Sequence, residues 1–318
     1  MTKTICIIGG TGFIGSHLSF HLANAGWRLR LPTRRPHRHR ELRVQQNIDL
    51  REANVHDPDT LRELFDGVDA VVNLAGILNE TGKDGFDKVH VELPRRIIAA
   101  MQETGVRRLL HMSALNADPT EPHSRYLRSK GEGEQQVMQA GRIAATSFRP
   151  SVVFGPGDSF FNRFASLLRL SPLVFPLACP EAKFAPVYVG DVVEAFEHAL
   201  HHDDSIGQVH ELCGPTVYSL RELVQFTARQ IGQRTLILGL PDFAARLQAR
   251  LLGLLPGKPF SLDNYYSLQR DSVCSRPALP DMGIDPHSIE CMVPAYLAER
   301  SPRGIYQHYR RLARRGGT

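Results

Sequence analysis

Three polar residues in the middle of the chain have the types and spacing that proton transfer at a carbonyl or alcohol requires. Tyr126 and Lys130 stand four residues apart in YLRSK, so they share one face of a helix, and Ser113 precedes them in HMSAL. A lysine ammonium beside a tyrosine is expected to lower the pKa of the phenol. The phenol can then exchange a proton with a substrate whose oxygen the serine hydroxyl orients. Because YxxxK is common on surface helices, the prediction of a catalytic Ser113, Tyr126 and Lys130 depends on the elements around them.

The surrounding sequence predicts the framework that would bring these residues together. Apolar runs with little polar alternation, typical of strands buried on both faces, alternate with stretches of helical spacing. The expected strands are residues 4–8, 28–31, 53–55, 70–74, 108–112 and 144–148, and the expected helices are residues 13–25, 59–65, 87–103 and 126–139. Repeated strand–helix order predicts an α/β fold with a doubly wound parallel sheet of the Rossmann type.

The pattern changes after Pro150. A proline-rich stretch, PLVFPLACPEAKFAP, is followed by a return to the sheet in VYVGDVVEAFEHALHH and GQVHELCG, with Asp191 near a helix start. From Ser219 onward the sequence is mainly helical. We therefore predict a nucleotide-binding Rossmann domain of residues 1–170 and 188–213. Residues 171–187 and 214–318 are expected to form a smaller, mostly helical lobe that covers the carboxyl ends of the strands.

A loop rich in glycine follows the first expected strand in TICIIGGTGFIGSHL. Gly9 suits a tight turn, Gly12 lets the backbone approach a pyrophosphate, and Gly15 lets the next helix pack closely on the sheet. The free N–H groups and the positive end of that helix favour phosphate. The loop therefore predicts a dinucleotide site, with contacts from Gly9, Thr11, Gly12, Phe13, Ile14 and Gly15.

The residues after the second strand bear on which dinucleotide is bound. A site specific for NAD places an acidic residue there, whereas RLRLPTRRPHR has Thr33, Arg34 and Arg35. A guanidinium suits a 2′-phosphate, so NADP(H) is predicted over NAD(H), unless the arginines form only an exposed basic loop. Further cofactor contacts are expected from Tyr126, Lys130 and residues near other strand ends: Asn54, Val55, Leu74, Ala75, Gly76, His90, Met112, Pro150 and Val153.

These motifs together resemble the short-chain dehydrogenase/reductase superfamily, in its extended or atypical form (the epimerase/dehydratase kind). The resemblance rests on GxxGxxG, NLAG, Ser113, YLRSK, RPSVVFGPGD and YVGDVVEAF. SFRPSVVFGPGDSFFNRFA and GIDPHSIECMVPAYL are similar to the branch that includes the dehydrogenase-like accessory subunit of respiratory complex I and its bacterial relatives. The resemblance implies a tightly held NADP(H). It does not imply turnover, because the mitochondrial relative is regarded as a structural subunit.

The chain departs from the family pattern at one position of a proton relay. Many members have an asparagine on the fourth helix, where KVHVELPRR has His90. His90 either takes part in the relay or is a polar helix residue bonded to backbone. The loop between Ser113 and Tyr126 is also shorter than in the sugar epimerases, which argues against a sugar-nucleotide substrate.

Composition limits the class of protein. The chain has 318 residues, of which 42% are hydrophobic and 22% charged, and no apolar run approaches the roughly 18–20 residues of a membrane span. The first strand starts near the N-terminus, so we expect no signal peptide and a cytoplasmic protein, with the inner-membrane surface as the other location. The five cysteines are scattered and are expected to be reduced, and no metal site is predicted.

The net charge of +5 allows contact with anionic partners. No nucleic-acid reader motif is present, so nucleic acid is not expected. In the tail RGIYQHYRRLARRGG, Ile305, Tyr309 and Leu312 share a helical face opposite arginines. This tail is predicted to meet an anionic membrane or a respiratory complex, or else to be solvated. PDFAARLQARLLGLLPG is interpreted as an ordinary core-and-surface helix, with a lid over an apolar substrate or a membrane-facing edge as alternatives.

Two functional hypotheses follow. The first is an NAD(P)H-dependent oxidoreductase acting on a carbonyl, hydroxyl or quinone-like substrate, small or lipid-like. The second is a nucleotide-bound structural or regulatory subunit of a respiratory or quinone system, without turnover.

Overall fold

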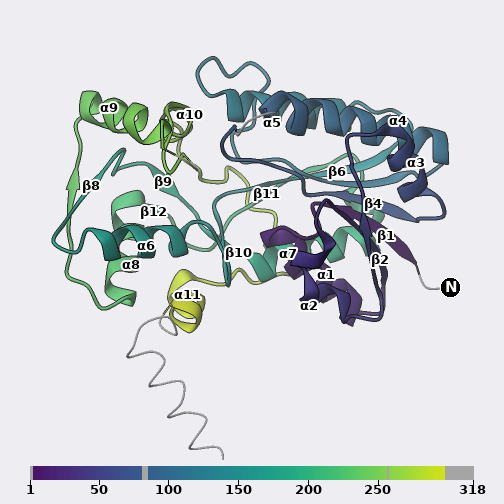
Figure 1. The fold of residues 1–318 in the computed structure, drawn as a ribbon, viewed down its shortest axis with the longest axis horizontal. Helices are drawn as coiled ribbons and strands as arrows, with labels where there is room; N and C mark the ends of the chain where they lie inside the picture. Colours follow the sequence, from purple (N-terminus) through teal and green to yellow (C-terminus); the bar gives the residue numbers. More distant parts are fainter. Residues whose placement is uncertain (1–2, 81–84, 256–257, 298–318) are drawn as a thin grey trace, which may run out of the picture.

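The fold is seen in a computed structural model that describes residues 3–80, 85–255 and 258–297 (Figure 1). Its centre is a parallel seven-stranded sheet with the order β3-β2-β1-β4-β5-β6-β11. The strands are β1 Thr4–Ile8, β2 Arg28–Thr33, β3 Ile48–Glu52, β4 Ala70–Asn73, β5 Arg108–Met112, β6 Ala144–Pro150 and β11 Val209–Leu212. The order reverses between β1 and β4, where a doubly wound sheet opens a crevice for ligands. The predicted fold class is confirmed.

Helices cover both faces of the sheet, and β1 shows how the sequence arranges this. Ile5 and Ile7 face one core, which they share with α1 (Phe13–Asn24) and α7 (Val189–His201). Cys6 and Ile8 face the other core, beneath α3 (Pro58–Phe65), α4 (Leu93–Thr104) and α5 (Arg125–Met138). Figure 1 shows the two helical layers above and below the sheet. Both faces of the strand are apolar because both are covered.

The predicted strand at residues 53–55 is wrong, since the third strand is Ile48–Glu52. It lies at the edge of the sheet, where β2 is its neighbour, and Ile48 is its one buried residue. An edge strand with a solvated face keeps polar residues, so NIDLRE lacks the apolar run used to recognise the other strands.

The expected helix over residues 87–103 is divided in two. A π-helix, η2 (Asp87–Glu92), leads into α4, whose first turn contains Pro94. Proline has no N–H to donate back along the helix, which favours a change of hydrogen-bonding pattern here. The wider π turn holds His90 in the interior, where it is 2% exposed.

The expectation that all five cysteines are reduced is also wrong. Cys213, just after β11, forms a disulfide with Cys274. The two cysteines are 61 residues apart in the sequence, and the fold brings them together next to Leu115 and Ala185. Spacing along the chain gave no sign of this pairing. Cys6, Cys179 and Cys291 are free.

The C-terminal lobe is mainly helical, with three short two-stranded sheets: β7 with β10, β9 with β12 and β8 with β13. Its strands are β7 Val153–Phe154, β8 Val174–Leu177, β9 Lys183–Phe184, β10 Val187–Tyr188, β12 Tyr218–Ser219 and β13 Leu236–Gly239. Its helices are α6 Phe161–Leu170, α8 Leu220–Gln230, α9 Asp242–Gly253, α10 Leu262–Ser267 and α11 Ile289–Leu297. The remaining short helices are η1 Pro36–Arg38, α2 Arg40–Arg43, η3 Asp203–Ser205 and η4 Pro280–Met282.

Packing shows how the lobe is joined to the sheet domain. α6 shares an apolar core with α8 and α11, and residues 278–284 return to the core beneath the sheet. The carboxylate of Asp191, fully buried in the first turn of α7, accepts hydrogen bonds from the backbone N–H and the ring of His287. The predicted division at residues 170, 188 and 213 stays a prediction. Within the described part of the chain, no helix has both the length and the apolar character of a membrane span.

Candidate active site

The glycine loop has the shape of a phosphate cradle. Gly9 has a φ of +80°, which L side chains rarely adopt, and a Cβ there would lie 2.9 Å from the carbonyl carbon of Leu74. A Cβ at Gly15 would lie 2.1 Å from the carbonyl oxygen of Gly9, so the start of α1 packs directly on the loop. Gly12 is exposed, and no side chain caps the α1 N-terminus. The positive end of α1 therefore opens onto the surface between Thr11 and Ile14.

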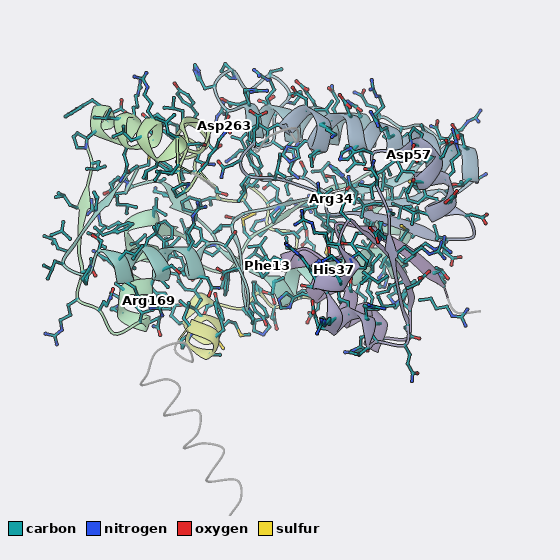
Figure 2. The ribbon with its side chains drawn as sticks, viewed as in Figure 1. Phe13, Arg34, His37, Asp57, Arg169 and Asp263 are labelled. Carbon is teal, nitrogen blue, oxygen red and sulfur yellow. A yellow bond between two sulfur atoms is a disulfide. The ribbon has the colours of Figure 1, made fainter. Side chains whose placement is uncertain are left out.

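The residues predicted to choose the dinucleotide lie at the neighbouring strand end. Thr33 is the last residue of β2, and its Oγ1 accepts a hydrogen bond of 3.4 Å from the backbone N–H of Arg35. Arg34 and Arg35 are exposed. Figure 2 shows Arg34 on the same side of the sheet domain as Phe13 at the start of α1. A guanidinium at this position can meet a phosphate carried on the ribose next to the glycine loop.

The other predicted cofactor residues also gather at the carboxyl edge of the sheet. Asn54 and Val55 follow β3, Met112 ends β5, and Pro150 ends β6. Leu74, Ala75 and Gly76 follow β4, and Val153 begins β7. Their common position follows from parallel strands, whose carboxyl ends all lie at one edge.

A buried polar pair holds the NLAG segment. The amide nitrogen of Asn73 lies 3.1 Å from His111 Nδ1, and Asn73 Oδ1 accepts a hydrogen bond of 3.2 Å from the N–H of Ala75. Both side chains are nearly inaccessible to solvent. Burial, together with the nearby charge of Lys130, lowers the pKa of His111 to about 3, so its ring is neutral.

Lys130 lies buried beneath this edge. Its Nζ donates a hydrogen bond of 3.1 Å to the backbone oxygen of Met112, the residue before Ser113. A Cβ at Gly76 would lie 3.1 Å from the same Nζ, so the absence of a side chain at Gly76 leaves room for the ammonium. Burial lowers the pKa of Lys130 to about 8, against the opposing effect of Glu134. The lysine therefore remains mostly an ammonium at neutral pH.

Tyr126 stands one turn before Lys130 on α5. Its ring lies 5.9 Å from the Phe86 ring and 5.7 Å from the His90 ring, centre to centre. Burial, reinforced by the negative charge of Asp263, raises the pKa of Tyr126 to about 12. The expectation that Lys130 lowers this pKa is not met. Aromatic rings and a carboxylate surround the phenol, while the ammonium is bonded to the Met112 carbonyl. Tyr126 is thus a phenol at neutral pH, able to donate a proton.

Ser113 follows β5 and is 3% exposed. Its backbone N–H donates to the Phe148 carbonyl, but its hydroxyl is buried without a hydrogen-bond partner in the described structure. A buried hydroxyl without a partner is unfavourable, so a polar ligand atom would be bound there with a gain.

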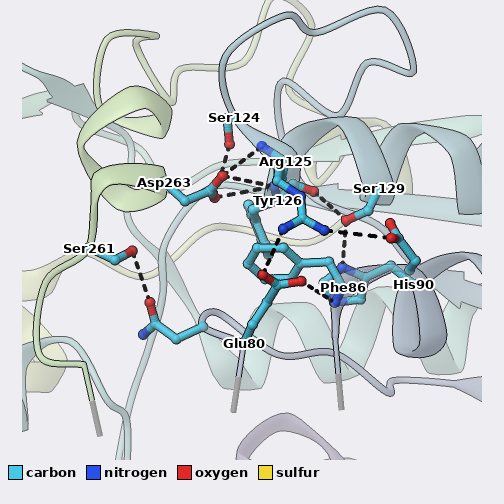
Figure 3. Close-up of polar contacts among 11 residues, drawn as sticks. Glu80, Phe86, His90, Ser124, Arg125, Tyr126, Ser129, Ser261 and Asp263 are labelled. Carbon is cyan, nitrogen blue, oxygen red and sulfur yellow. Dashed lines mark hydrogen bonds and ion pairs between the residues drawn. The ribbon is translucent and has the colours of Figure 1, made fainter. Parts of the chain in front are cut away.

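His90 joins two parts of the site. Its Nε2 accepts a hydrogen bond of 3.1 Å from the backbone N–H of Ile77, which assigns the ring proton to Nδ1, 2.9 Å from Ser129 Oγ. Ser129 in turn donates to the Tyr126 carbonyl. Burial is the main cause that lowers the pKa of His90 to about 2. A neutral His90 with both nitrogens engaged fixes the loop after β4 against α5, as Figure 3 shows for its α5 side.

Sequence reasoning missed the lobe residue that holds the start of α5. The Asp263 carboxylate on α10 accepts hydrogen bonds from the backbone N–H of Arg125 and of Tyr126 and from the Ser124 hydroxyl (Figure 3). Asp263 belongs to no motif and lies 137 residues from Tyr126, so nothing local in the sequence indicates this contact. It fixes the lobe against the helix that carries Tyr126 and Lys130.

A pocket of about 530 Å³ opens beside this junction, between the loop after β4, the start of α5 and the α9–α10 region. Phe86, Leu254 and Leu262 supply apolar lining, and Arg125, Arg250 and Lys258 supply positive charge. Glu80 forms an ion pair of 2.9 Å with Arg125. Because Phe86 contacts both the pocket and the Tyr126 ring, the pocket lies next to the predicted catalytic residues.

The family model for the NAD dependent epimerase/dehydratase family matches residues 5–213, and the chain belongs to this family. It is 32% identical over 293 residues to NADH dehydrogenase (ubiquinone) 1 alpha subcomplex subunit 9 of Rattus norvegicus, covering 89% of this chain and 77% of that protein. It is 28% identical over 309 residues to the NADH-ubiquinone oxidoreductase 40 kDa subunit of Neurospora crassa, covering 95% and 81%.

A third relative carries an enzyme name. The ceramide reductase of Caulobacter vibrioides is 29% identical over 240 residues, covering 75% of this chain and 74% of that protein. Among solved structures, MoeE5 in complex with UDP-glucuronic acid and NAD has a TM-score of 0.73 at 19% identity, covering 96% of this chain and 100% of that one. At this identity the structural likeness shows the fold alone.

Proposed function

We propose that the chain is an NADP(H)-dependent oxidoreductase that reduces the carbonyl group of a lipid-like or quinone-like substrate. The observation that supports this best is the unpartnered, buried hydroxyl of Ser113 at the edge where Lys130 and the protonated Tyr126 also lie. A structural site gains nothing from a buried hydroxyl without a partner, whereas a substrate oxygen would satisfy it.

The residues can divide the work of a carbonyl reduction. A bound NADPH would supply the hydride that forms the new C–H bond at the carbonyl carbon. The Ser113 hydroxyl donates a hydrogen bond to the carbonyl oxygen and orients it. The Tyr126 phenol gives its proton to the same oxygen, which completes the alcohol and leaves a phenolate. The Lys130 ammonium, which is bonded to the Met112 carbonyl at the same edge, would hold the ribose of the nucleotide, and water returns the proton to the phenolate.

The cofactor assignment rests on the cradle and its charged neighbours. Gly12 is exposed, and no side chain caps the N-terminus of α1. Arg34 and Arg35 follow β2, where a site specific for NAD has an acidic residue. These features fit a pyrophosphate and a 2′-phosphate. Binding of NADPH in preference to NADH is therefore part of the proposal.

The substrate class rests on the pocket and on the relatives. Apolar and cationic side chains share the pocket wall with the carboxylates of Glu80 and Asp263, and such a mixed wall suits an amphiphile with a polar head. One relative is named for the reduction of a ceramide, and others are named as subunits of a ubiquinone-linked dehydrogenase.

A second candidate is a nucleotide-bound structural subunit of a respiratory complex, without turnover. The names of the Rattus norvegicus and Neurospora crassa relatives favour it. The tail expected to make such a contact, with Ile305, Tyr309 and Leu312, lies outside the described residues, so its role stays a prediction. A cytoplasmic protein at the inner-membrane surface would suit either candidate.

Replacing the Tyr126 hydroxyl separates the two candidates. Tyr126→Phe keeps the ring contacts with Phe86 and His90 but removes the proton donor. For an enzyme, NADPH oxidation with ketones, quinones or a ceramide-type ketone should fall about 10²–10⁴-fold at unchanged NADPH affinity. NADPH should also raise the thermal midpoint by mass action. A thermal shift without any Tyr126-dependent turnover would support the structural subunit instead.

The cofactor preference has its own measurement. Arg34→Gln with Arg35→Gln should weaken NADPH binding by about 1.5–3 kcal/mol and leave NADH binding nearly unchanged. Calorimetric titration of both cofactors measures this. Equal affinities for NADPH and NADH in the wild type would refute the preference.

A further inference from the structure

The helix α9 buries its small residues and exposes its large apolar ones, the reverse of an ordinary amphipathic surface helix. Its inner face consists of small residues, with Ala245 2% exposed and Ala249 fully buried. The large apolar residues point outward: Phe243 is 74% exposed, Leu247 53% and Leu251 58%. Their spacing of four residues places them on one face of the helix. The structure therefore contradicts the interpretation of this segment as an ordinary core-and-surface helix.

The apolar surface continues onto the strand pair next to α9. In the β8–β13 ribbon, Val174 pairs with Leu236, and they are 43% and 64% exposed. The Gln248 side chain of α9 donates a hydrogen bond to the Pro176 carbonyl of β8, which fixes the helix against the ribbon. Also exposed beside them are Leu170, Leu173, Leu238 and Leu254. Two of the elements that carry these residues, α9 and β8, lie at the outer end of the lobe, at the left of Figure 1.

The charges of the same segments have one sign. Residues 161–177 and 228–255 contain six arginines: Arg163, Arg169, Arg229, Arg234, Arg246 and Arg250. Their only acid is Asp242, which forms an ion pair of 2.9 Å with Arg246. Figure 2 shows Arg169 at the lower side of the lobe, by α6 and α8, whereas α9 lies at its upper side in the same view of Figure 1. The outer end of the lobe thus combines exposed leucines with five exposed arginines, while Arg163 is only partly exposed and donates to the Lys258 carbonyl.

We propose that this outer end of the lobe is a docking surface for an anionic lipid bilayer. Leucines can enter the headgroup and acyl boundary while arginines stay beside lipid phosphates, as in interfacial amphipathic helices. Two copies of the chain meeting through this surface would bring arginines together without acids to pair them. The bilayer provides both an apolar layer and a dense negative charge, which complements the surface on both counts.

The docking surface adjoins the pocket beside Tyr126. Arg250 and Leu254 belong to the surface and also line the pocket wall. Docking would therefore place the pocket mouth near the lipid headgroups. The docking proposal does not depend on turnover, since a structural subunit could use the same surface.

Vesicle binding by the full-length protein tests the proposal. The probes are phosphatidylcholine vesicles with and without phosphatidylglycerol, separated by flotation. The wild type should bind the anionic vesicles, and added salt should weaken the binding. A variant with Phe243→Gln, Leu247→Gln and Leu251→Gln should need roughly tenfold more lipid for half-binding. Arg169→Gln with Arg234→Gln should weaken binding to anionic vesicles and leave binding to neutral ones unchanged.

The control is Val44→Gln, which removes an apolar side chain that is 79% exposed on the sheet domain. It should bind vesicles like the wild type. Thermal midpoints of all variants in NADPH verify that each is folded. Wild-type binding by the triple variant would overturn the proposal, because another segment would then carry the contact. The proposal would also be overturned if the wild-type protein bound no vesicles and light scattering showed that it self-associates through this face instead.

Discussion

The helices α4 and α9 are each 12 residues long, and both contain large aliphatic residues and arginines. Their large apolar side chains are buried in α4 and exposed in α9. α4 buries Leu93, Ile97 and Met101 against the sheet. α9 buries two alanines and leaves Phe243, Leu247 and Leu251 in solvent. The difference lies in what each helix packs against, since the wide apolar face of a sheet accepts large side chains.

The inner neighbours of α9 explain its reversed face. Ala245 and Ala249 lie against Ala178 and the ring of Tyr265, which bring the helix close and leave no space for a leucine. In α4 the large residues stabilise the fold, so they are not available for a partner. In α9 they contribute little to the fold and remain available. The contrast separates residues that a core selects from residues that a binding surface selects.

The contrast predicts unequal costs of truncation. Ile97→Ala should lower the free energy of unfolding by about 2–5 kcal/mol, because it leaves a cavity between α4 and the sheet. Leu251→Ala removes a side chain of the same size from solvent and should change stability by less than about 0.5 kcal/mol. Urea unfolding measures both. A cost for Leu251→Ala close to that for Ile97→Ala would show that α9 has a covering element in the folded protein.

Features set by local sequence could be predicted from the sequence, whereas features set by tertiary contacts could not. The glycine loop and the parallel strand order follow from local rules, and the sequence predicts both. The position of Lys130 at the end of β5, bonded to the residue before Ser113, agrees with the predicted arrangement, while the roles of these residues stay predictions. The face of α9 that is buried depends on Tyr265 and Ala178, which no local pattern connects to it. Likewise, the Cys213–Cys274 disulfide pairs residues that only the tertiary fold brings together.

Buried charge distinguishes the two regions further. Beside α4, the sheet domain buries Lys130 at 6% exposure, whereas the arginines of α9 remain in water. The pKa of Lys130 is about 8 in the folded chain and about 10.5 when unfolded. Between these values the unfolded chain binds more protons, so stability rises with pH there. Lys130→Met should remove this rise, worth up to about 3 kcal/mol.

Unfolding measured from pH 7 to 10.5 without nucleotide tests this, with the exposed Lys183→Met as the control. The variant should be more stable than the wild type at pH 7 and lose that advantage near pH 10. If the two pH profiles are parallel, the ammonium is not buried as described.

Low pH should also destabilise the sheet domain, through two buried histidines. His90 and His111 are both 2% exposed and have pKa values lowered to about 2 and 3. Below pH 6.5 the unfolded chain protonates them and the folded chain does not, so stability falls as the pH falls. Each should account for a loss of about 2 kcal/mol at pH 5. His111→Gln should reduce the loss by that amount, while the exposed His37→Gln should leave it unchanged.

The smallest effect concerns α10, which lies between the two regions. Ser261 and Asn264 form a capping box at its start, as Ser219 and Glu222 do for α8. Ser261→Ala and Ser219→Ala should each lower the free energy of unfolding by about 1 kcal/mol.

The effects of these two variants on the site should differ, because α10 carries Asp263, whose carboxylate accepts a hydrogen bond from the backbone N–H of Tyr126. Fraying of α10 would loosen that contact, whereas fraying of α8 would not reach it. Ser261→Ala should therefore slow Tyr126-dependent NADPH oxidation several-fold more than Ser219→Ala at matched stability. Equal rates in the two variants would mean that α5 is positioned by the sheet domain alone, without help from the lobe.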